Sequence, residues 1–442
     1  MTEIWADFFL LQDPNLRWVL AGTVMLGLSA GALGCFAVLR ERALVGDAVA
    51  HSVLPGVCLA FIITGDKDPL ALLIGSVVFG WISLLVMDFV IRNSKISTDT
   101  SIGMVLSVFF GLGVVMLTWI QNSGNANQSG LDAFLFGNAA SMLPEDVLLF
   151  GFVSVMVLVT IILLFKELKL VSFDPGFATV IGYPMKRMEV LMATLLVVTI
   201  TAGLQAVGVV LMASMLIIPA AAARYWTDSL VVMLVIAAGV GAISAISGTF
   251  VSYTAPSMPT GPWMVVSAAA LFTLSFFFAP ARGEFQKWRR RRRQQEKVSG
   301  ENILKTLYKL EERDGLSARS RTRREILKKR RMEPASLKKG LRRLVSQGLV
   351  QHLKGQPSGY LLTEGGREEA KRIVRIHRLW ELYLTEKLQL PGDHVHDPAE
   401  SMEHVITPEL EQQLMRILNN PEEDPHNKRI PKASPRSGGA AL

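Results

Sequence analysis

Two polar residues in an apolar stretch near the N-terminus have the types and the spacing of metal ligands. Asp47 and His51 are four residues apart in a run that stays hydrophobic to about Gly65. That spacing puts both side chains on one face of a helix, one turn apart. A carboxylate oxygen and an imidazole nitrogen suit a borderline divalent metal such as manganese, iron or zinc. The pair therefore predicts either a metal position or an Asp–His hydrogen bond that only holds helices together.

The apolar surroundings of this pair favour an ion path. A carboxylate in the middle of a membrane helix costs about 2.5–3.5 kcal/mol on insertion scales, and such residues usually face the interior of a bundle. Pro55 follows in the same predicted helix and has no backbone N–H. We therefore expect a kink, and a free carbonyl group close to the pair.

A second grouping of metal-ligand types lies in the C-terminal third of the chain. His377 and Glu381 are four apart on one predicted helix, and Glu400, Glu403 and His404 share one face of another. A single i,i+4 His–Glu pair is usually a surface pair. Two converging sets favour a metal, and histidines with carboxylates suit manganese or ferrous iron better than a thiolate zinc site.

A basic helix precedes these ligands. Residues 333–345 have leucines on one face and cations on the other, and residues 348–363 read as two short strands around a Gly/Pro turn. Before the basic helix, Ile303, Leu304 and Leu307 form the apolar stripe of another predicted helix. Helix, basic helix and hairpin together indicate a winged helix-turn-helix, whose basic helix would enter a DNA groove. The candidate DNA-binding residues are Ser336, Lys338, Lys339, Arg342 and Arg343. A basic helix that faces lipid or RNA is the alternative.

The elements that must position the first pair are membrane spans. Residues 1–281 hold 11 Lys and Arg against 16 Asp and Glu, a net charge of −5; residues 282–442 hold 35 against 22, a net of +13, and the two make the overall +8. An apolar N-terminal part and a basic C-terminal part indicate two kinds of domain. Spans need about 20 apolar residues, which predicts eight or nine of them. The predicted spans are 18–39, 44–64, 69–91, 101–121, 145–165, 188–205, 207–225, 229–253 and 261–280.

The distribution of basic residues between these spans predicts their orientation. Four joints between spans are basic, whereas the loop 122–131 has no Lys or Arg, so that loop is expected outside and the four basic joints in the cytoplasm. Nine spans with the N-terminus outside satisfy this pattern. The basic joints are those of Arg40 and Arg42, of Arg92 and Lys95, of Lys166, Lys169, Lys186 and Arg187, and of Arg224. Arg289–Arg293 follow the last span and place the C-terminus in the cytoplasm. The same run could bind anionic lipid headgroups or only enforce the topology.

The cytoplasmic joint around residues 172–184 has the signals of a short capped helix. Asp174 before Pro175 is an N-cap and first-turn signal, and Gly182 to Pro184 is a stop. Such a helix between two spans suits docking of another chain, with Phe173, Asp174, Pro175 and Ala178 as its candidate contact residues. A plain connecting helix is the alternative.

Seven sequence motifs, in order, resemble the manganese/zinc/iron ABC transporter permease family over about residues 15–281. They are Leu44–Gly56, Asp99–Gly103, Leu135–Gly137, Ser172–Pro175, Leu204–Val209, Ile218–Arg224 and Pro259–Pro262. The resemblance implies a homo- or heterodimer of permeases in the bacterial inner (plasma) membrane, a cytoplasmic ATPase docked on 172–184, and an extracytoplasmic metal-binding protein. It also implies that Asp47 and His51 line the metal path. The chain has no Gly-x-x-x-x-Gly-Lys-Ser/Thr loop, so ATP hydrolysis is expected from a separate subunit and no enzyme activity from this one.

Residues 301–432 resemble the diphtheria-toxin-repressor family of metal-dependent regulators. The motifs are His377–Glu381, Val395–Asp397, Ala399–His404, Asp424–His426 and Ile430–Pro431. The resemblance implies one metal site at His377, Glu381 and His396 and a second at Glu400, Glu403 and His404, and Glu400 at a common cysteine position favours manganese over iron. Asn302 and Lys305 stand where the family supplies an acidic or Met ligand, so the second site departs from the pattern.

The expected fold is an all-α polytopic membrane bundle followed by a cytoplasmic winged helix-turn-helix and a helical metal-binding and dimerisation domain. The expected domains are the permease at 1–281, a basic linker at 282–300, the winged helix-turn-helix at 301–370, the metal-binding domain at 371–432 and a disordered tail at 433–442.

Three functions fit this organisation. The favoured one is the permease subunit of a divalent-metal ABC importer with a metal-responsive, DNA-binding tail, using Mn²⁺ or Fe²⁺ before Zn²⁺. The second is a membrane-anchored, metal-dependent transcription regulator without transport, and the third is a zinc permease whose tail only gates the channel. The retained path and docking motifs favour transport.

Overall fold

The structure is a computed structural model with two compact units, Met1–Lys287 and Trp288–Leu442. It describes residues 8, 10–11, 13–40, 42–66, 68–122, 137, 142–254, 258–315, 319–355, 358–391 and 394–432, without the side chains of 43, 205, 206, 210, 211 and 401. The predicted external loop, apart from Asn122, and the predicted tail at 433–442 lie outside the described residues. Residues 284–300, expected to be a linker, form the first part of a long helix.

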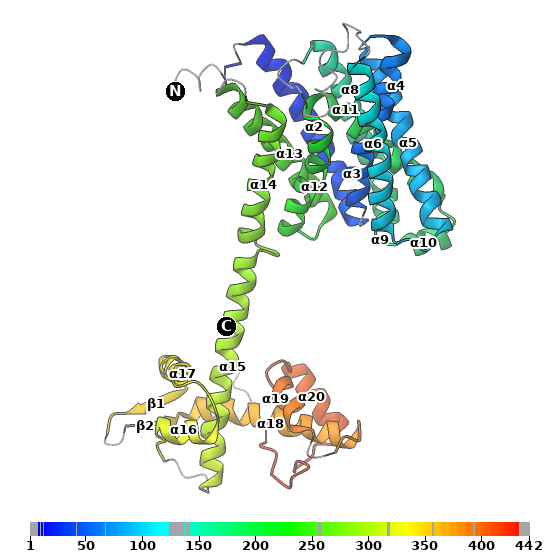
Figure 1. Cartoon of the computed structure of the whole chain (residues 1–442). Coiled ribbons are helices and arrows are strands. Elements are labelled where there is room, and N and C mark those ends of the chain that lie inside the picture. Colours follow the sequence, from blue (N-terminus) through cyan, green and yellow to red (C-terminus); the bar gives the residue numbers. More distant parts are fainter. Residues whose placement is uncertain are drawn as a thin grey trace. The chain divides into compact units, whose positions relative to one another are not determined.

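Apolar helices build the first unit (Figure 1). They are α2 (Pro14–Leu39), α3 (Ala43–Ser52), α4 (Leu54–Thr64), α5 (Pro69–Asn93), α6 (Thr98–Gln121), α8 (Pro144–Leu163), α11 (Met185–Val207), α12 (Val209–Trp226), α13 (Leu230–Thr254) and α14 (Thr260–Phe278). Eight segments of the described part are long and apolar enough to cross a membrane, with α3 and α4 together forming one of them. The short α12 is a further apolar helix that begins after Gly208. The predicted helical membrane bundle is confirmed.

Small residues let α2 pack closely against α13. A Cβ atom on Gly27 would lie 2.6 Å from the carbonyl oxygen of Gly241, and one on Gly31 would meet the carbonyl oxygen of Ala237. Between helices in lipid, such close approach replaces the hydrophobic effect as the source of association. These glycines therefore hold α2 in the centre of the bundle, and α2 leads directly to the helix that carries Asp47.

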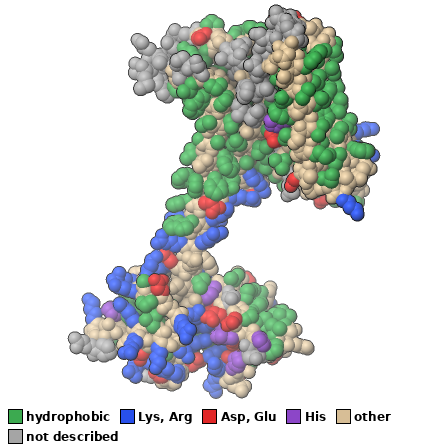
Figure 2. Space-filling model, viewed as in Figure 1, with side chains coloured by type: hydrophobic (Ala, Val, Ile, Leu, Met, Phe, Trp, Pro, Cys, Tyr) green, Lys and Arg blue, Asp and Glu red, His purple; other side chains and the backbone are tan. Residues whose placement is uncertain are grey.

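The outer surface of the first unit is apolar. Figure 2 shows hydrophobic side chains over its visible face, and Leu85, Phe89 and Phe152 are each more than 60% exposed. Apolar exposure on this scale is expensive in water and is expected where lipid is the solvent. The pattern agrees with spans predicted from hydropathy.

The second unit has a winged helix-turn-helix and a helical part. Its elements are α15 (Glu284–Arg313, which starts in the first unit), α16 (Arg323–Lys329), α17 (Pro334–Ser346), β1 (Val350–Leu353), β2 (Gly359–Leu362), α18 (Glu364–Glu386), α19 (His396–Met402) and α20 (Pro408–Ile417). The strands pair antiparallel with Val350 opposite Leu362 and Leu353 opposite Gly359. The predicted order of helix, basic helix and hairpin is confirmed.

Buried apolar and ionic contacts fix α18, which carries two predicted metal ligands. Leu337, Leu341 and Leu344 of α17 pack into the same core as Ile373 of α18. Arg378 reaches Glu312 of α15 at 2.7 Å, while Arg375 donates to Glu411 of α20 at 2.6 Å. Because buried charges are costly unless paired, these contacts hold α18 in one register against α15 and α20.

Candidate metal centres

The membrane pair lies on α3, inside the first unit. His51 Nε2 is 3.7 Å from Asp47 Oδ1, which is longer than a hydrogen bond. The His51 ring meets Phe110 of α6 edge-on at 5.1 Å between centroids, and its Nδ1 is buried without a hydrogen-bond partner among the described residues. Buried polar atoms are normally satisfied, so an unpartnered imidazole nitrogen is suited to receive a ligand. Both residues belong to one helix, so the pair does not join two helices.

The helix break near the pair falls earlier than the predicted kink. α3 ends at Ser52 and α4 begins at Leu54, with Pro55 in its first turn. Proline is tolerated in a first helical turn because those N–H groups have no intrahelical partner. The chain therefore restarts its helix just before Pro55, one turn from His51.

The predicted docking segment, 172–184, takes in the end of α9 (Phe165–Phe173) and all of α10 (Pro175–Val180), with Asp174 between the two helices. Asp174 Oδ1 accepts a hydrogen bond from the Phe177 backbone N–H at 2.8 Å, which caps α10 as predicted. Phe173 and Phe177 are each 54% exposed and Val180 is 85% exposed, whereas Ala178 is fully buried. In this arrangement the exposed apolar side chains can contact another chain, whereas Ala178 packs the helix against the bundle.

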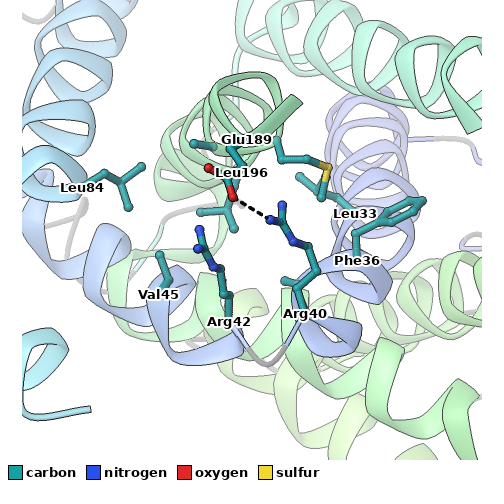
Figure 3. Close-up of a pocket in the computed structure, with 11 residues that line it drawn as sticks. Leu33, Phe36, Arg40, Arg42, Val45, Leu84, Glu189 and Leu196 are labelled. Atoms are coloured by element: carbon teal, nitrogen blue, oxygen red, sulfur yellow. Dashed lines mark hydrogen bonds and ion pairs between the residues drawn. The ribbon is translucent and has the colours of Figure 1, made fainter. Parts of the chain in front are cut away.

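A pocket beside the start of α3 contains an ion pair that was not predicted from the sequence. Arg40, at the end of α2, lies 3.4 Å from Glu189 of α11 (Figure 3). Arg42 and Val45 also line this pocket. The ion pair links α2 to α11 close to the helix of Asp47; the signal available beforehand was the presence of charged residues at span ends.

One predicted ligand set of the second unit comes together. His377 and Glu381 project from α18, and His396 is the first residue of α19. Glu381 Oε1 lies 3.1 Å from His377 Nε2 and 2.9 Å from His396 Nδ1, and the three ligand atoms are all within 4.8 Å of one another. It is the one cluster of this kind found in the described part of the chain.

The electrostatics of this cluster keep its carboxylate ionised. Burial alone would raise the pKa of Glu381, but hydrogen bonds and charge interactions with His377 and His396 lower it to about 2. A deprotonated carboxylate and two imidazoles are a donor set that Mn²⁺, Fe²⁺ or Zn²⁺ accepts. The residues present therefore fit a divalent metal.

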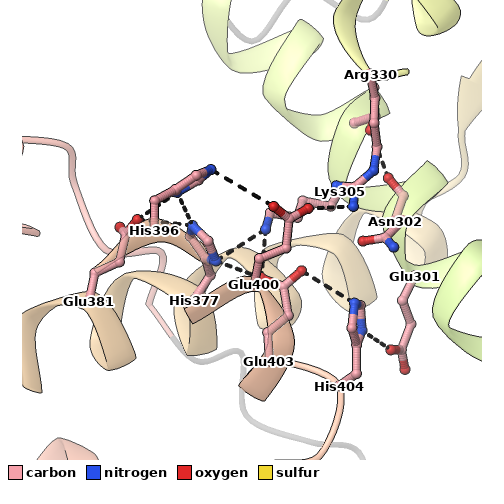
Figure 4. A network of polar contacts seen from close by, with 11 residues as sticks. Glu301, Asn302, Lys305, Arg330, His377, Glu381, His396, Glu400, Glu403 and His404 are labelled. Atoms are coloured by element: carbon pink, nitrogen blue, oxygen red, sulfur yellow. Dashed lines mark hydrogen bonds and ion pairs between the residues drawn. The ribbon is translucent and has the colours of Figure 1, made fainter. Parts of the chain in front are cut away.

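The other predicted set does not converge in the same way (Figure 4). Glu400 forms an ion pair with Arg330, and His404 Nδ1 lies 2.6 Å from Glu301 Oε2. Glu403 Oε2 is 2.6 Å from both Lys305 Nζ and His377 Nδ1. Burial would raise the pKa of Glu403, but His377 and Lys305 lower it. Its charge is thus already compensated by protein groups.

The cations of the predicted DNA-binding helix fall into two groups. All four are exposed on α17. Of these, Lys339 Nζ and Arg343 Nη1 reach Glu296 of α15 at 2.5 and 3.0 Å. Ser336, at the start of α17, donates to Glu333 at 3.3 Å. Glu296 is not among the residues predicted from the sequence, because nothing in its local pattern shows that α15 passes beside α17.

Residues 12–279 match the family model of the ABC 3 transport family, and this is more than half of the chain. The chain belongs to the ABC 3 transport family. Residues 363–432 of this ABC 3 permease match a second model, the iron dependent repressor metal binding and dimerisation domain. Both predicted resemblances are confirmed, and the chain combines a permease with a domain of a metal-dependent repressor.

The names of two relatives of this ABC 3 permease include a transported metal. The Manganese transport system membrane protein MntC of Bacillus subtilis (strain 168) is 42% identical over 380 residues, which cover 86% of each chain. The Zinc transport system membrane protein TroC of Treponema pallidum (strain Nichols) is 44% identical over 284 residues, 64% of this chain and 95% of its own. Among solved structures, PsaBC from Streptococcus pneumoniae in complex with Fab is 33% identical with a TM-score of 0.57, covering 65% of this chain and 98% of that one.

The similarity to the Bacillus subtilis relative is longer than the first unit. Its 380 aligned residues exceed the 287 residues of Met1–Lys287. The aligned region therefore extends into the second unit of this ABC 3 permease.

Proposed function

We propose that this chain is the permease subunit of an importer for a divalent metal, with manganese favoured over iron and zinc. The observation that carries the proposal is the Asp47–His51 pair on α3, with an unpartnered buried imidazole nitrogen. Its setting in a bundle of the ABC 3 transport family makes these residues candidates for the path of the metal, which is the substrate. The name of the Bacillus subtilis relative supports manganese, and the Treponema pallidum relative keeps zinc as an alternative. Metal-competition uptake by cells that express the full chain tests this choice.

The importer needs partners that this chain does not supply. We infer a cytoplasmic ATPase subunit, an extracytoplasmic metal-binding protein and a second permease, identical or not, in the plasma membrane of a bacterium. The C-terminus lies in the cytoplasm, because five consecutive arginines, Arg289–Arg293, follow the last span. The same arginines are placed to meet anionic lipid headgroups.

The exposed apolar surface of α10 is the proposed ATPase contact. Phe177→Asp or Val180→Asp places a charge in that contact, and we expect co-purification of the ATPase subunit to fall by roughly tenfold or more, as for interface anchors. Asn122→Asp is the matched control, since it adds the same charge at the end of α6. Unchanged co-purification with both α10 variants would place the docking site elsewhere.

We propose that metal binding by the second unit changes its affinity for DNA. Residues 301–370 would form the DNA-binding part and residues 371–432 the metal-binding and dimerising part. Binding of a metal to His377, Glu381 and His396 joins α18 to α19, and it favours arrangements in which these helices are correctly placed. A regulator without transport is the competing function; the capped α10 with exposed apolar side chains favours transport, because only a transporter needs an ATPase contact.

Glu296 limits the cations that α17 can offer to phosphate. Glu296→Gln removes the charge that holds Lys339 and Arg343, so affinity for non-specific duplex DNA is expected to rise. Each cation that gains a phosphate contact steepens the dependence of log K on log salt by about 0.9. Gel shifts of the full chain in detergent at several salt concentrations measure this slope. Glu284→Gln, on the same helix but paired with Lys287, should leave it unchanged.

A further inference from the structure

Lys305 is a buried cation in the middle of the regulator's ligand sets. Its side chain is 2% exposed, and Nζ lies 2.6 Å from Glu403 Oε2 and 3.1 Å from His377 Nδ1 (Figure 4). A buried lysine is costly to desolvate and is stable only where acceptors surround it. The ammonium group therefore stands in a position of the kind that a metal would take.

The carboxylates of the second set are neutralised from two directions. Lys305 of α15 compensates Glu403, and Arg330, directly after α16, compensates Glu400. A divalent ion at this place would meet the ammonium group at close range, and the negative charges of Glu403 and Glu400 are already balanced by Lys305 and Arg330. Repulsion between like charges in a buried site is strong.

Ligand atoms nevertheless remain in the same network, in which Figure 4 draws Asn302, Glu403 and His404. Asn302 Oδ1, Glu403 Oε1 and His404 Nε2 are buried and have no hydrogen-bond partner within the described residues. Glu403 Oε1 and His404 Nε2 are 3.6 Å apart. An amide oxygen, a carboxylate oxygen and an imidazole nitrogen are a suitable donor set for Mn²⁺ or Fe²⁺. What this set lacks is net negative charge, because the single carboxylate is shared with Lys305.

We propose that the Lys305 ammonium group takes the position of a second metal and prevents a metal from binding there. The regulator then binds one divalent metal, at His377, Glu381 and His396. The inference rests on the proposed metal-sensing function and specifies its stoichiometry. Removal of the ammonium charge leaves the carboxylate of Glu403 without its cation from Lys305, and its unpartnered Oε1 can then bind a second metal together with Asn302 and His404.

The test counts bound Mn²⁺ in the full chain in detergent. Asp47→Ala and His51→Ala are present throughout, so that the membrane pair does not contribute. Equilibrium dialysis gives the number of ions, and electron paramagnetic resonance distinguishes an isolated Mn²⁺ from two coupled ions. We expect one isolated ion in the parent, none after His396→Ala, and two after Lys305→Met.

Matched variants separate charge from packing. Lys305→Arg keeps the charge and should hold one ion, and Lys309→Met removes a charge from the same helix one turn away and should also hold one. Two coupled ions in the parent, or one ion that survives His396→Ala and is lost with Glu403→Gln, would overturn the proposal, even if Lys305→Met does not fold. A second ion after Lys309→Met but not after Lys305→Met would overturn it too. No bound ion in the parent would instead overturn the metal-sensing function on which it rests.

Discussion

Alanine at Asp47 or at His51 is expected to stop metal uptake while the protein remains in the membrane. The two side chains are the ligand types on α3 that face the same side, and each substitution removes one of them. Loss of supporting residues around a metal typically costs 10–100-fold in affinity, so loss of a direct ligand should cost roughly 100-fold or more. Uptake of radioactive manganese by cells that lack other importers, normalised to protein in the membrane fraction, measures the effect.

The control for this experiment is another carboxylate in the bundle. Asp88→Ala on α5 removes an acidic side chain that lies 3.8 Å from Arg92 and is more than half exposed. Its uptake should remain at the parental rate. Parental uptake by both the Asp47 and the His51 variants would exclude the pair from the path and would favour a regulator without transport.

His396→Ala is expected to abolish the effect of metal on DNA binding by the full chain. His396 is a member of the converging set, and because its side chain is about half exposed (51%), its loss should leave the fold intact. Without it, Glu381 and His377 alone hold the metal, and the affinity should fall by roughly 10–100-fold or more. DNA binding at low salt, which we propose depends on the cations of α17 and not on the metal, should persist.

A gel-shift titration with and without Mn²⁺ at fixed salt separates the metal-dependent part of DNA binding from the metal-independent part. The parent should bind duplex DNA of its cognate promoter more tightly with metal, whereas the His396 variant should give the same curve in both arms. His426→Ala removes an exposed histidine outside the ligand set and should behave like the parent. A metal effect that survives His396→Ala would mean that the response arises elsewhere in the chain.

The two units place the transported ion and the proposed regulatory ion on one polypeptide. If both take the same metal, the regulator responds to the ion that its own permease delivers. Metal-dependent DNA binding by a chain that stays in the membrane would couple import to transcription close to the point of entry.

Many features of this molecule depend only on residues that are close along the chain, and these features could be predicted from the sequence. The faces shared by Asp47 and His51, and by His377 and Glu381, follow from helical spacing alone. The spans follow from hydropathy and length, and the cap at Asp174 follows from the side chain that satisfies a free N–H of the next turn. These predictions depend only on neighbours along the chain.

The remaining features depend on contacts between distant segments, and only the tertiary structure decided them. Ala178 was expected to contact a partner and is buried, because the capped α10 turns that face toward the bundle. Lys305 and Glu403 are 98 positions apart, yet their side chains are 2.6 Å from each other. Glu296 reaches Lys339 across 43 positions. A sequence shows which charges exist, but the packing of α15 against α17, α18 and α19 determines which of them are paired and therefore which are free to bind metal or DNA.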